Sequence, residues 1–395
     1  MKDMQAAQAA TVRTTWDEAL ARERILILDG AIGTMLQAAG LTEDDFRAGP
    51  LAGCPVELRG NNECLNLTRP DVVRAVHEAY IEAGADIITT NTFGANAIVQ
   101  HDYGCAELAP RMALAGARLA RAAADAAGRP VLVAGSVGPT SKSLTLSPSA
   151  DDPTARTVGF DEMAAAYAAQ MRALLLGGAD VLLLETCFDA LNVKAALYAL
   201  MGLADDPAAR RELHLTERFG PDGLPPVIVS ATVSDRSGRT LTGQTLEAFY
   251  AAVSHYPLAA FGLNCSLGAD EMYPLVSEVA AFASCPVSCH PNAGLPDGLG
   301  GYGETPEAMA RAMGRMAADA LLDIAGGCCG TTPAHVRAIA RAVAGCRPRR
   351  CLRPVADASP GCLVVSGLEA VGIDLGTRRF TNVGERTNVA GSRKF

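Results

Sequence analysis

The 395-residue sequence predicts an α/β protein built as a (β/α)8 TIM barrel. Three observations lead to this prediction. Short runs rich in Val, Ile and Leu alternate with longer Ala-rich segments of helical spacing, about eight such pairs fill the chain, and polar residues or cysteines follow the apolar runs. A doubly wound sheet would place a G-x-G-x-x-G turn after its first strand. The turn at 29–34 reads DGAIGT, so the barrel is the better interpretation.

The elements of this barrel can be assigned in chain order. The expected strands are Ile25–Asp29, Ile87–Asn91, Val131–Ser136, Val181–Glu185, Val227–Val233, Ala260–Asn264, Pro286–His290 and Leu322–Ala325. The clearest expected helices are Pro70–Ala83, Glu162–Leu176, Leu246–His255 and Pro306–Leu321. Two helical segments end at glycine just before a strand, in EAGADIITT and LGGADVLLL, as expected for an αβ connection.

The domain boundaries follow from where this alternation starts and stops. We expect an N-terminal extension over residues 1–23, the barrel over 24–345 and a linker over 346–376, which contains RPRRCLRPVADASP. A last apolar run, Arg379–Val383, lies near the start of the segment 377–395. One strand and a turn cannot bury a core, so this segment is interpreted as the truncated start of a second domain.

Composition excludes several classes of protein. The net charge of −9 argues against a general nucleic-acid binder. No apolar run reaches the ~18 residues of a membrane-spanning helix, and residues 1–23 lack the continuous apolar core of a secretory signal. Twelve cysteines in such a chain indicate a cytoplasmic protein with reduced thiols that serve metal binding or catalysis.

The functional groups of a TIM barrel lie at the carboxyl ends of its strands. Read in order, these ends carry Asp29, Asn91, Ser136, Glu185, Asp235, Cys265, His290 with Asn292, and Cys328 with Cys329. Asp29, Asn91 and Asp235 could equally cap helices or make turns. Glu185 ends the run VLLLE, so a buried carboxylate there needs a partner, either a substrate ammonium or Lys194.

The cysteines at two strand ends are the most informative of these residues. A single cysteine would most simply be a buried apolar residue. The adjacent pair Cys328-Cys329, flanked by glycines in IAGGCCGTTP, together with Cys265 in GLNCSLG, favours a metal site instead. Three thiolates suit zinc, and three protein ligands with an open fourth position are typical of a catalytic site. Cys64, Cys187 and Cys289 also lie near strand ends, so a fourth cysteine ligand stays possible.

Such a site favours thiol alkylation over hydrolysis. Only the thiolate is a good nucleophile, and coordination to a metal ion deprotonates a thiol. Three anionic sulfurs outweigh the charge of a divalent ion, so the bound substrate sulfur stays electron-rich. Zinc hydrolases typically use His and carboxylate ligands with a bound water.

Several motifs resemble the homocysteine S-methyltransferase family over residues 24–345. They are LDGAIGT (28–34), NTFGAN (91–96), GSVGPT (135–140), ETCFDALN (185–192), GLNCSLG, HPNAGLP (290–296) and GGCCGTTP. The last segment, FTNVGERTNVAGSRKF, resembles the opening of the pterin-binding domain of cobalamin-dependent methionine synthases. The chain therefore resembles the N-terminal homocysteine-binding module of those enzymes, followed by the start of the pterin-binding barrel.

The resemblance implies a role for each motif residue. Cys265, Cys328 and Cys329 would bind Zn²⁺, and the sulfur of L-homocysteine would take the fourth position, which Asn292 would hold in its absence. Glu185, assisted by Asp29, would bind the substrate amino group, and the N–H groups of Gly30 and Ala31 its carboxylate. His290 would shape its loop without binding metal. Methylcobalamin, carried by a domain absent from this chain, would donate the methyl group, and the cobalamin-binding and folate-binding domains would be partners.

Other functions fit parts of the same pattern. The barrel could be a stand-alone methyltransferase that uses betaine or S-methylmethionine, or part of a fusion to a folate reductase, although the tail argues against both. In a different class, the cysteines could form a structural zinc knuckle or a redox switch in a non-catalytic amino-acid-binding barrel.

Overall fold

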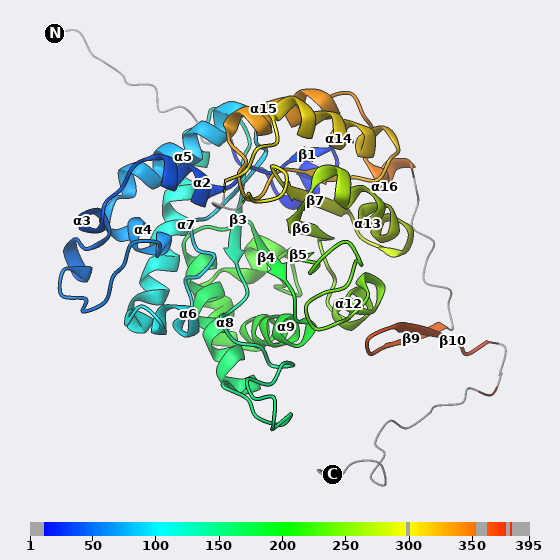
Figure 1. Cartoon of the computed structure of the whole chain (residues 1–395), viewed down its shortest axis with the longest axis horizontal. Coiled ribbons are helices and arrows are strands. Elements are labelled where there is room, and N and C mark those ends of the chain that lie inside the picture. Colours follow the sequence, from blue (N-terminus) through cyan, green and yellow to red (C-terminus); the bar gives the residue numbers. More distant parts are fainter. Residues whose placement is uncertain (1–11, 298–300, 353–361, 377–379, 381–395) are drawn as a thin grey trace.

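The computed structural model describes residues 12–297, 301–352, 362–376 and 380 (Figure 1). Its centre is a sheet of eight parallel strands in the order β1-β8-β7-β6-β5-β4-β3-β2. The strands are β1 (Leu26–Ile27), β2 (Ile87–Thr89), β3 (Leu132–Val137), β4 (Val181–Cys187), β5 (Val227–Ala231), β6 (Ala260–Gly268), β7 (Val287–Asn292) and β8 (Ile324–Ala325). A bridge between Leu28 and Ile87 joins the first strand to the second and closes the barrel. The predicted TIM barrel and its eight strands are confirmed.

Helices surround the strands, as the alternation in the sequence predicts (Figure 1). The helices that follow successive strands are α2 (Ile32–Ala38), α4 (Leu65–Thr68), α5 (Pro70–Ala83), α6 (Ala97–His101), α7 (Ala109–Asp125), α8 (Phe160–Leu176), α9 (Ala190–Asp205), α12 (Leu246–Val253), α13 (Ala269–Phe282), α14 (Pro306–Ala318) and α15 (Pro333–Val343). Gly84 ends α5 with a φ of 109°, a left-handed conformation that a side chain would disfavour.

The apolar residues form two clusters. The larger cluster fills the space between the strands and the helices. The smaller one lies within the barrel and comprises Leu26, Leu28, Ile87, Leu132, Ala134, Val181, Leu183, Ile228, Ala260 and Ile324. Trp16 and Ala19 of α1 (Trp16–Leu20) pack against this inner cluster, so the extension before β1 contributes a helix to the core. The inner cluster uses the amino-terminal parts of the strands and leaves their carboxyl ends for polar groups.

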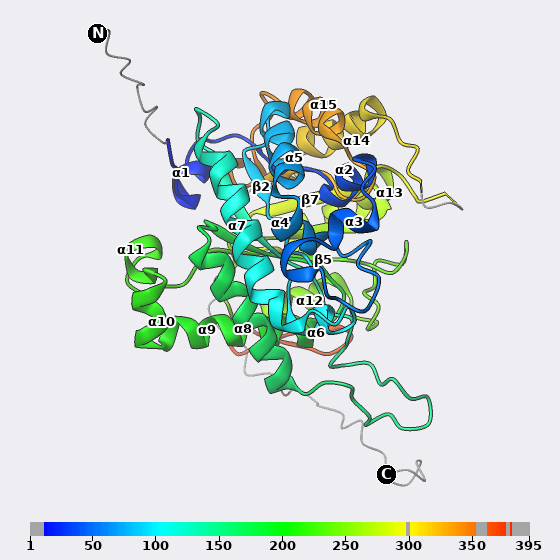
Figure 2. The ribbon, with the colours of Figure 1, turned by 90° about the vertical axis from the view of Figure 1, so that its left-hand side faces the viewer.

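Two long stretches between strands, residues 38–68 and 202–226, contain short helices. Residues 38–68 include α3 (Glu43–Phe46), the 3-10 turns Gly49–Leu51 and Asn62–Cys64, and α4. Residues 202–226 form α10 (Pro207–Glu212) and α11 (Leu215–Phe219), which extend from the end of α9 (Figure 2). The latter pair is a surface excursion before β5, as the charged and Pro-rich sequence suggests.

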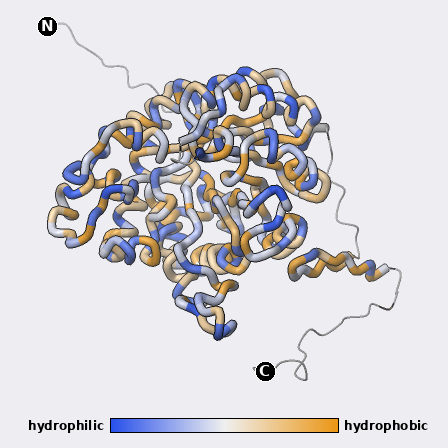
Figure 3. Tube along the Cα trace, in the orientation of Figure 1, coloured by the Kyte–Doolittle hydropathy of each residue, from blue (hydrophilic) through white to orange (hydrophobic). Residues whose placement is uncertain are grey.

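A hairpin lies in the segment that we expected to be a linker. After α16 (Arg349–Leu352), β9 (Cys362–Ser366) pairs antiparallel with β10 (Ala370–Asp374). The hairpin turn contacts the barrel near α12, where the Thr245 N–H donates to the Leu368 carbonyl at 2.9 Å. Its strands are rich in apolar side chains that are about half exposed (Figure 3). Apart from Phe380, the expected start of a pterin-binding domain over 377–395 lies outside the described residues.

Within the described ranges, none of the helices combines the length and the apolar character that crossing a bilayer requires.

Gly262 in β6 provides a test of the packing between barrel strands. A Cβ built on Gly262 would be 1.9 Å from the carbonyl oxygen of Ser288, a backbone atom of β7 that cannot move aside. Gly262→Ala should therefore lower the free energy of unfolding by ~2 kcal/mol or more. The control Gly202→Ala in α9 meets nothing within 4 Å and should stabilise the protein by roughly 0.5–1 kcal/mol. Chemical denaturation followed by circular dichroism measures both, and equal effects would contradict the packing argument.

Candidate metal and substrate site

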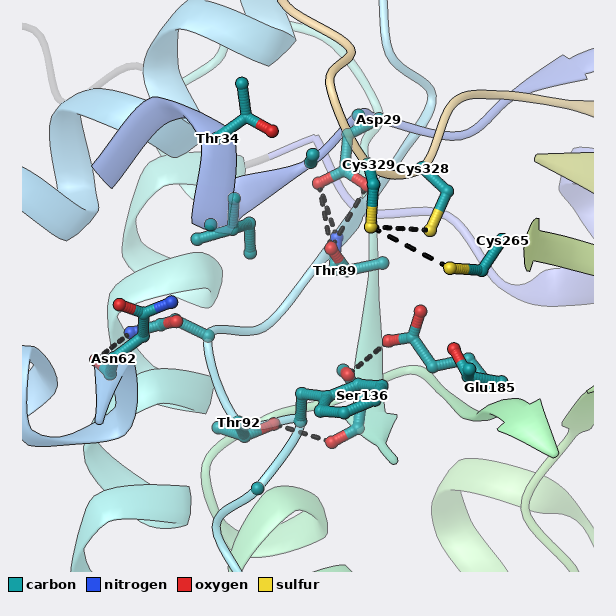
Figure 4. Close-up of a pocket in the computed structure, with 18 of the residues that line it drawn as sticks. Asp29, Thr34, Asn62, Thr89, Thr92, Ser136, Glu185, Cys265, Cys328 and Cys329 are labelled. Carbon is teal, nitrogen blue, oxygen red and sulfur yellow. Dashed lines mark hydrogen bonds between the residues drawn. The ribbon is translucent and has the colours of Figure 1, made fainter. Parts of the chain in front are cut away.

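A pocket of about 580 Å³ opens at the carboxyl ends of the strands. Its walls come from the carboxyl-terminal parts of β2, β3, β4, β6 and β7 and from the segments that follow β1, β2, β7 and β8. Seven of the predicted site residues line it together: Asp29, Gly30, Ala31, Glu185, Cys265, Cys328 and Cys329. Figure 4 shows the two carboxyl groups and the three thiols among them. The pocket is thus the carboxyl-end face at which TIM-barrel enzymes place their catalytic groups.

The three cysteines converge at one end of the pocket. The Sγ atom of Cys329 is 3.8 Å from that of Cys265 and 4.0 Å from that of Cys328. All three sulfurs lie within 4.8 Å of one another. Three thiolates at about 2.3 Å from one tetrahedral zinc ion would be about 3.8 Å apart, so the spacing fits such an ion.

Glycines allow the cysteine pair to pack closely against its neighbours. A Cβ on Gly326 would be 2.8 Å from the Leu28 side chain, and one on Gly327 would be 2.6 Å from Thr331. Gly330 follows with a φ of 79°. The Cys328 N–H donates to the Pro291 carbonyl at 2.7 Å, which ties the pair to the end of β7. The glycines of the sequence GGCCG therefore allow the backbone to place two thiols at the pocket wall.

Backbone irregularities direct the side chains of Glu185 and Cys265 into the pocket. The register between β4 and β5 shifts between Leu184 and Cys187, and that between β6 and β7 shifts after Asn264. Thr186 and Cys265 have φ values of 56° and 62°, which is unusual for residues with a side chain. Bulges of this kind redirect side chains next to active sites. Here the irregularity in β4 lies next to Glu185, and the one in β6 includes Cys265.

The side chain of Asn292 is buried at the end of β7 and is not among the residues that line the pocket. Its Oδ1 is buried and has no hydrogen-bond partner among the described residues. Asn292 ends β7, and the N–H of the next residue, Ala293, donates to the Cys329 carbonyl at 2.9 Å. A buried acceptor without a donor is costly in a protein interior, and a bound cation would satisfy it.

The remaining cysteines named as possible ligands do not join this centre. In the part of the chain that the structure describes, Cys265, Cys328 and Cys329 are the group whose ligand atoms are close enough to share a metal ion. Cys289 is buried with its Sγ 3.8 Å from the Met272 sulfur. The other two, Cys64 and Cys187, are also buried outside the group.

The proximity of the three thiols strongly perturbs their ionisation. Hydrogen bonds from Cys265 and Cys328 lower the pKa of Cys329 well below the usual range of a thiol. Hydrogen bonding with Cys265 and Cys329 raises the pKa of Cys328. One thiol of the group therefore ionises readily and opposes ionisation of the next. A cation is required for all three to be thiolates at neutral pH.

Two carboxyl groups face the pocket without a cationic partner. Asp29 accepts hydrogen bonds from the Thr89 N–H at 2.8 Å and the Thr89 hydroxyl at 3.1 Å, and burial raises its pKa to about 8. Glu185 accepts a hydrogen bond from the Ser136 hydroxyl, and burial raises its pKa to about 7. No ion pair involves either carboxyl group within the described residues. An ammonium group that entered the pocket could therefore pair with both carboxyl groups.

Lys194 does not serve as the partner of Glu185. It lies on α9 and lines a separate pocket that also contains Leu368 of the hairpin turn. This alternative from the sequence is therefore wrong, because α9 directs the lysine to the outside of the barrel.

The other predicted residues take different positions. Ala31 precedes α2, and its N–H donates to Thr331 Oγ1 at 3.1 Å; Gly30 leaves no room for a Cβ beside Thr331 and Tyr80. His290 is buried and lines the pocket, and burial lowers its pKa to about 4. Asp235 is exposed and accepts a hydrogen bond from the Ser237 N–H at 2.7 Å, a turn-forming role outside the pocket.

Three residues in or near the pocket were not predicted from the sequence. Glu63 is buried at the pocket wall and accepts a hydrogen bond from the Gly94 N–H at 2.7 Å. Asn264 lies behind the thiols, and Tyr302 lines the pocket beside them. Glu63 lies in the polar stretch RGNNECLNL (59–67), which is a sequence signal for it. Asn264, in contrast, has the sequence context of an ordinary strand end.

The fold and this site define a class of protein, a TIM barrel with a three-thiol centre able to hold a metal ion. Residues 26–343 match the sequence model of the homocysteine S-methyltransferase family. The chain belongs to the homocysteine S-methyltransferase family, and it is a methyltransferase.

Solved structures agree with this assignment. The chain is similar to the homocysteine methyltransferase MmuM from Escherichia coli in its oxidized form, with a TM-score of 0.61 and 23% identity, covering 83% of this chain and 99% of that chain. The metallated form of the same protein matches with a TM-score of 0.57 and 25% identity, covering 81% of this chain and 97% of that chain. The likeness to the oxidized form supports the fold.

The raised pKa of Asp29 predicts a pH-dependent stability. Its folded-state pKa of about 8 lies above the ordinary value of 3.8, so the folded protein binds the extra proton. The stabilising contribution is complete below about pH 4 and is lost as the pH rises toward about 8. In metal-free protein, the free energy of unfolding of the wild type should fall as the pH rises from about 6 to about 8.5. In Asp29→Asn it should fall less, and the difference should be on the order of 2 kcal/mol.

Urea denaturation at the two pH values measures this effect. Asp235→Asn, which changes an exposed carboxyl group in a turn, is the control and should follow the wild type. If Asp29→Asn and the wild type lost the same free energy over this interval, the carboxyl group of Asp29 would not be protonated as described.

Proposed function

We propose that the chain is the homocysteine-activating module of a cobalamin-dependent methionine synthase. In this proposal Cys265, Cys328 and Cys329 hold Zn²⁺, and L-homocysteine accepts a methyl group from methylcobalamin to give methionine. The observation that carries the proposal is the convergence of three sulfurs within 4.8 Å in a pocket that also contains two carboxyl groups without cationic partners among the described residues. The family assignment supplies homocysteine as the substrate.

The metal site is proposed from the chemistry of its donors. Soft thiolates select zinc among the common divalent ions, and the spacing of the sulfurs suits a tetrahedral ion. Asn292 is the proposed fourth ligand without substrate, because its Oδ1 is buried and unpartnered within the described ranges. A bound zinc ion would lower the pKa of the homocysteine thiol, so that the substrate would be a thiolate at neutral pH.

The other end of the substrate is proposed to bind the carboxyl groups. Glu185 and Asp29 receive the homocysteine ammonium, which supplies the positive charge that their environment lacks. This contact lowers the raised pKa values of both groups, because an opposite charge favours the ionised form. The N–H groups of Gly30 and Ala31 are the proposed contacts of the substrate carboxylate, and Ala31 would then exchange its bond to Thr331 Oγ1 for one to the substrate.

The methyl donor is proposed from the sequence that follows the barrel. Residues 380–395 resemble the opening of a pterin-binding domain, which supports cobalamin-binding and folate-binding domains as partners. A centre of three reduced thiols also suits a reducing compartment, so we propose that the protein works in the cytoplasm.

One comparison favours a second candidate. The barrel covers 99% of the length of the MmuM chain, so a single barrel suffices for that homocysteine methyltransferase. This chain could likewise be a stand-alone enzyme with a small donor such as betaine or S-methylmethionine.

The metal content tests the thiolate centre. Elemental mass spectrometry should find about one zinc ion per chain in the wild type. Cys328→Ser should lose this zinc, because two thiolates hold zinc less tightly than three. The fold should persist in this variant, since the barrel has its own apolar core. Cys362→Ser, at an exposed cysteine outside the pocket, is the matched control and should keep its zinc. Metal-free protein that bound homocysteine as tightly as the zinc-loaded form would contradict the proposal.

The donor is tested by supplying each candidate with homocysteine and measuring methionine by mass spectrometry. We expect methionine from methylcobalamin and none from betaine or S-methylmethionine. Product from one of the two small donors, with none from methylcobalamin, would establish the second candidate. If no donor gave methionine although zinc and homocysteine bound, the barrel would be a binding protein with a zinc knuckle.

A further inference from the structure

Asn264 occupies a buried position directly behind the thiol centre. It immediately precedes Cys265 in β6, at the point where the regular pairing with β7 is interrupted. Its side chain is 1% exposed and does not line the pocket. It therefore contacts the site from within the barrel wall.

The side-chain amide of Asn264 makes four contacts. Its Oδ1 accepts hydrogen bonds from the Thr186 N–H at 2.8 Å and the Ser230 hydroxyl at 2.7 Å. Its Nδ2 donates to Thr186 Oγ1 at 2.8 Å and to Cys328 Sγ at 3.7 Å. Both lone pairs and both hydrogens of the amide are thus used, which is the full capacity of the group.

These partners fix which way the amide points. A backbone N–H can only donate, so the atom facing the Thr186 N–H must be the amide oxygen. The amide nitrogen then has to face the sulfur of Cys328. The N–H contact with that sulfur is consequently imposed by Thr186 of β4, and it stabilises negative charge on the sulfur.

Asn264 also joins the two distorted segments of the barrel. Thr186 has a φ of 56°, a strained conformation for a β-branched residue, and Asn264 holds it with two hydrogen bonds. Thr186 directly follows Glu185, and Asn264 directly precedes Cys265. One amide therefore fixes the carboxyl group at one end of the site relative to the thiols at the other.

We propose that Asn264 is a positioning residue that sets the spacing between the Glu185 carboxylate and the three-thiol centre, and thereby selects homocysteine over cysteine. The proposal rests on the proposed function, in which the substrate is held by its amino group at Glu185 and by its sulfur at the metal. A ligand held at both ends must have the length of the gap. Cysteine is one methylene shorter than homocysteine, so it cannot reach both anchors while their spacing is fixed.

Two variants separate the bonds of the amide to Thr186 from its contact with Cys328. Asn264→Ala removes the bonds to Thr186 and to Cys328 together. Asn264→Asp keeps an acceptor for the Thr186 N–H and can accept from the Thr186 hydroxyl, but it replaces the N–H donor at the Cys328 sulfur by an oxygen. Ser288→Ala in β7 is the matched control, because it removes a buried hydroxyl that has no hydrogen-bond partner among the described residues.

The readouts are ligand affinity and the spectrum of the metal centre. Calorimetry of zinc-loaded protein gives the Kd values of homocysteine and cysteine, and the thiolate-to-metal absorption of cobalt-substituted protein reports on the sulfur ligands. In Asn264→Ala we expect homocysteine to bind at least ~10-fold more weakly and the preference over cysteine to fall by a similar factor, with a shifted absorption band. In Asn264→Asp the band should shift while most of the preference remains. Ser288→Ala should match the wild type in both.

Glu185→Gln provides a further comparison, because it should weaken homocysteine binding without shifting the cobalt band. If the wild type binds metal and homocysteine but Asn264→Ala equals Ser288→Ala in both readouts, the positioning role is wrong and the proposed function stands. If the wild type takes up neither zinc nor cobalt, the proposed function fails and the positioning role fails with it. Should Asn264→Ala not fold, an unshifted band in Asn264→Asp overturns the contact with Cys328.

Discussion

Electrostatic repulsion between neighbouring sulfurs is the constraint on which the rest of this structure depends. Three thiols lie within 4.8 Å of one another, and each additional thiolate raises the cost of ionising the next. Several local features of the chain nevertheless build this arrangement. Glycines admit the cysteine pair, a bulge turns Cys265 inward, and the Cys328 N–H is tied to the end of β7. Such a cluster is stable as an anion when a cation shares it, which makes metal binding the natural use of the site.

The pocket extends the same principle to its other end. Asp29 and Glu185 are carboxyl groups removed from water, and burial raises the pKa of both. Each has hydrogen-bond donors, yet the described residues supply neither with a positive charge. An amino acid with a thiol side chain would satisfy both ends, since its ammonium complements the carboxyl groups and its sulfur completes the metal centre. The membership of the chain in the homocysteine S-methyltransferase family agrees with this complementarity.

The scaffold keeps these groups apart from the parts that provide stability. The inner apolar cluster fills the amino-terminal half of the barrel, and α1 packs against it. The bulges and the polar residues of the pocket lie at the carboxyl ends of the strands, where hydrogen bonds with Asn264 of β6 hold the distorted backbone of Thr186 in β4. The barrel can therefore tolerate strain at the site, because its core lies elsewhere.

Sequence alone determined the barrel, its eight strands and the residues at their ends, because apolar runs and glycine stops are local patterns. It also singled out Cys265 and the pair Cys328-Cys329, because adjacent thiols between glycines are typical of a metal site and unusual in an apolar core. Tertiary structure decided which strand-end groups meet. It brought Glu185 to the pocket and Lys194 to the outside, left Asp235 in an exposed turn, and formed a hairpin over Cys362–Asp374 where a linker was expected. Bulges and the contacts of Asn264 were hidden from the sequence, because they depend on strands that are far apart along the chain.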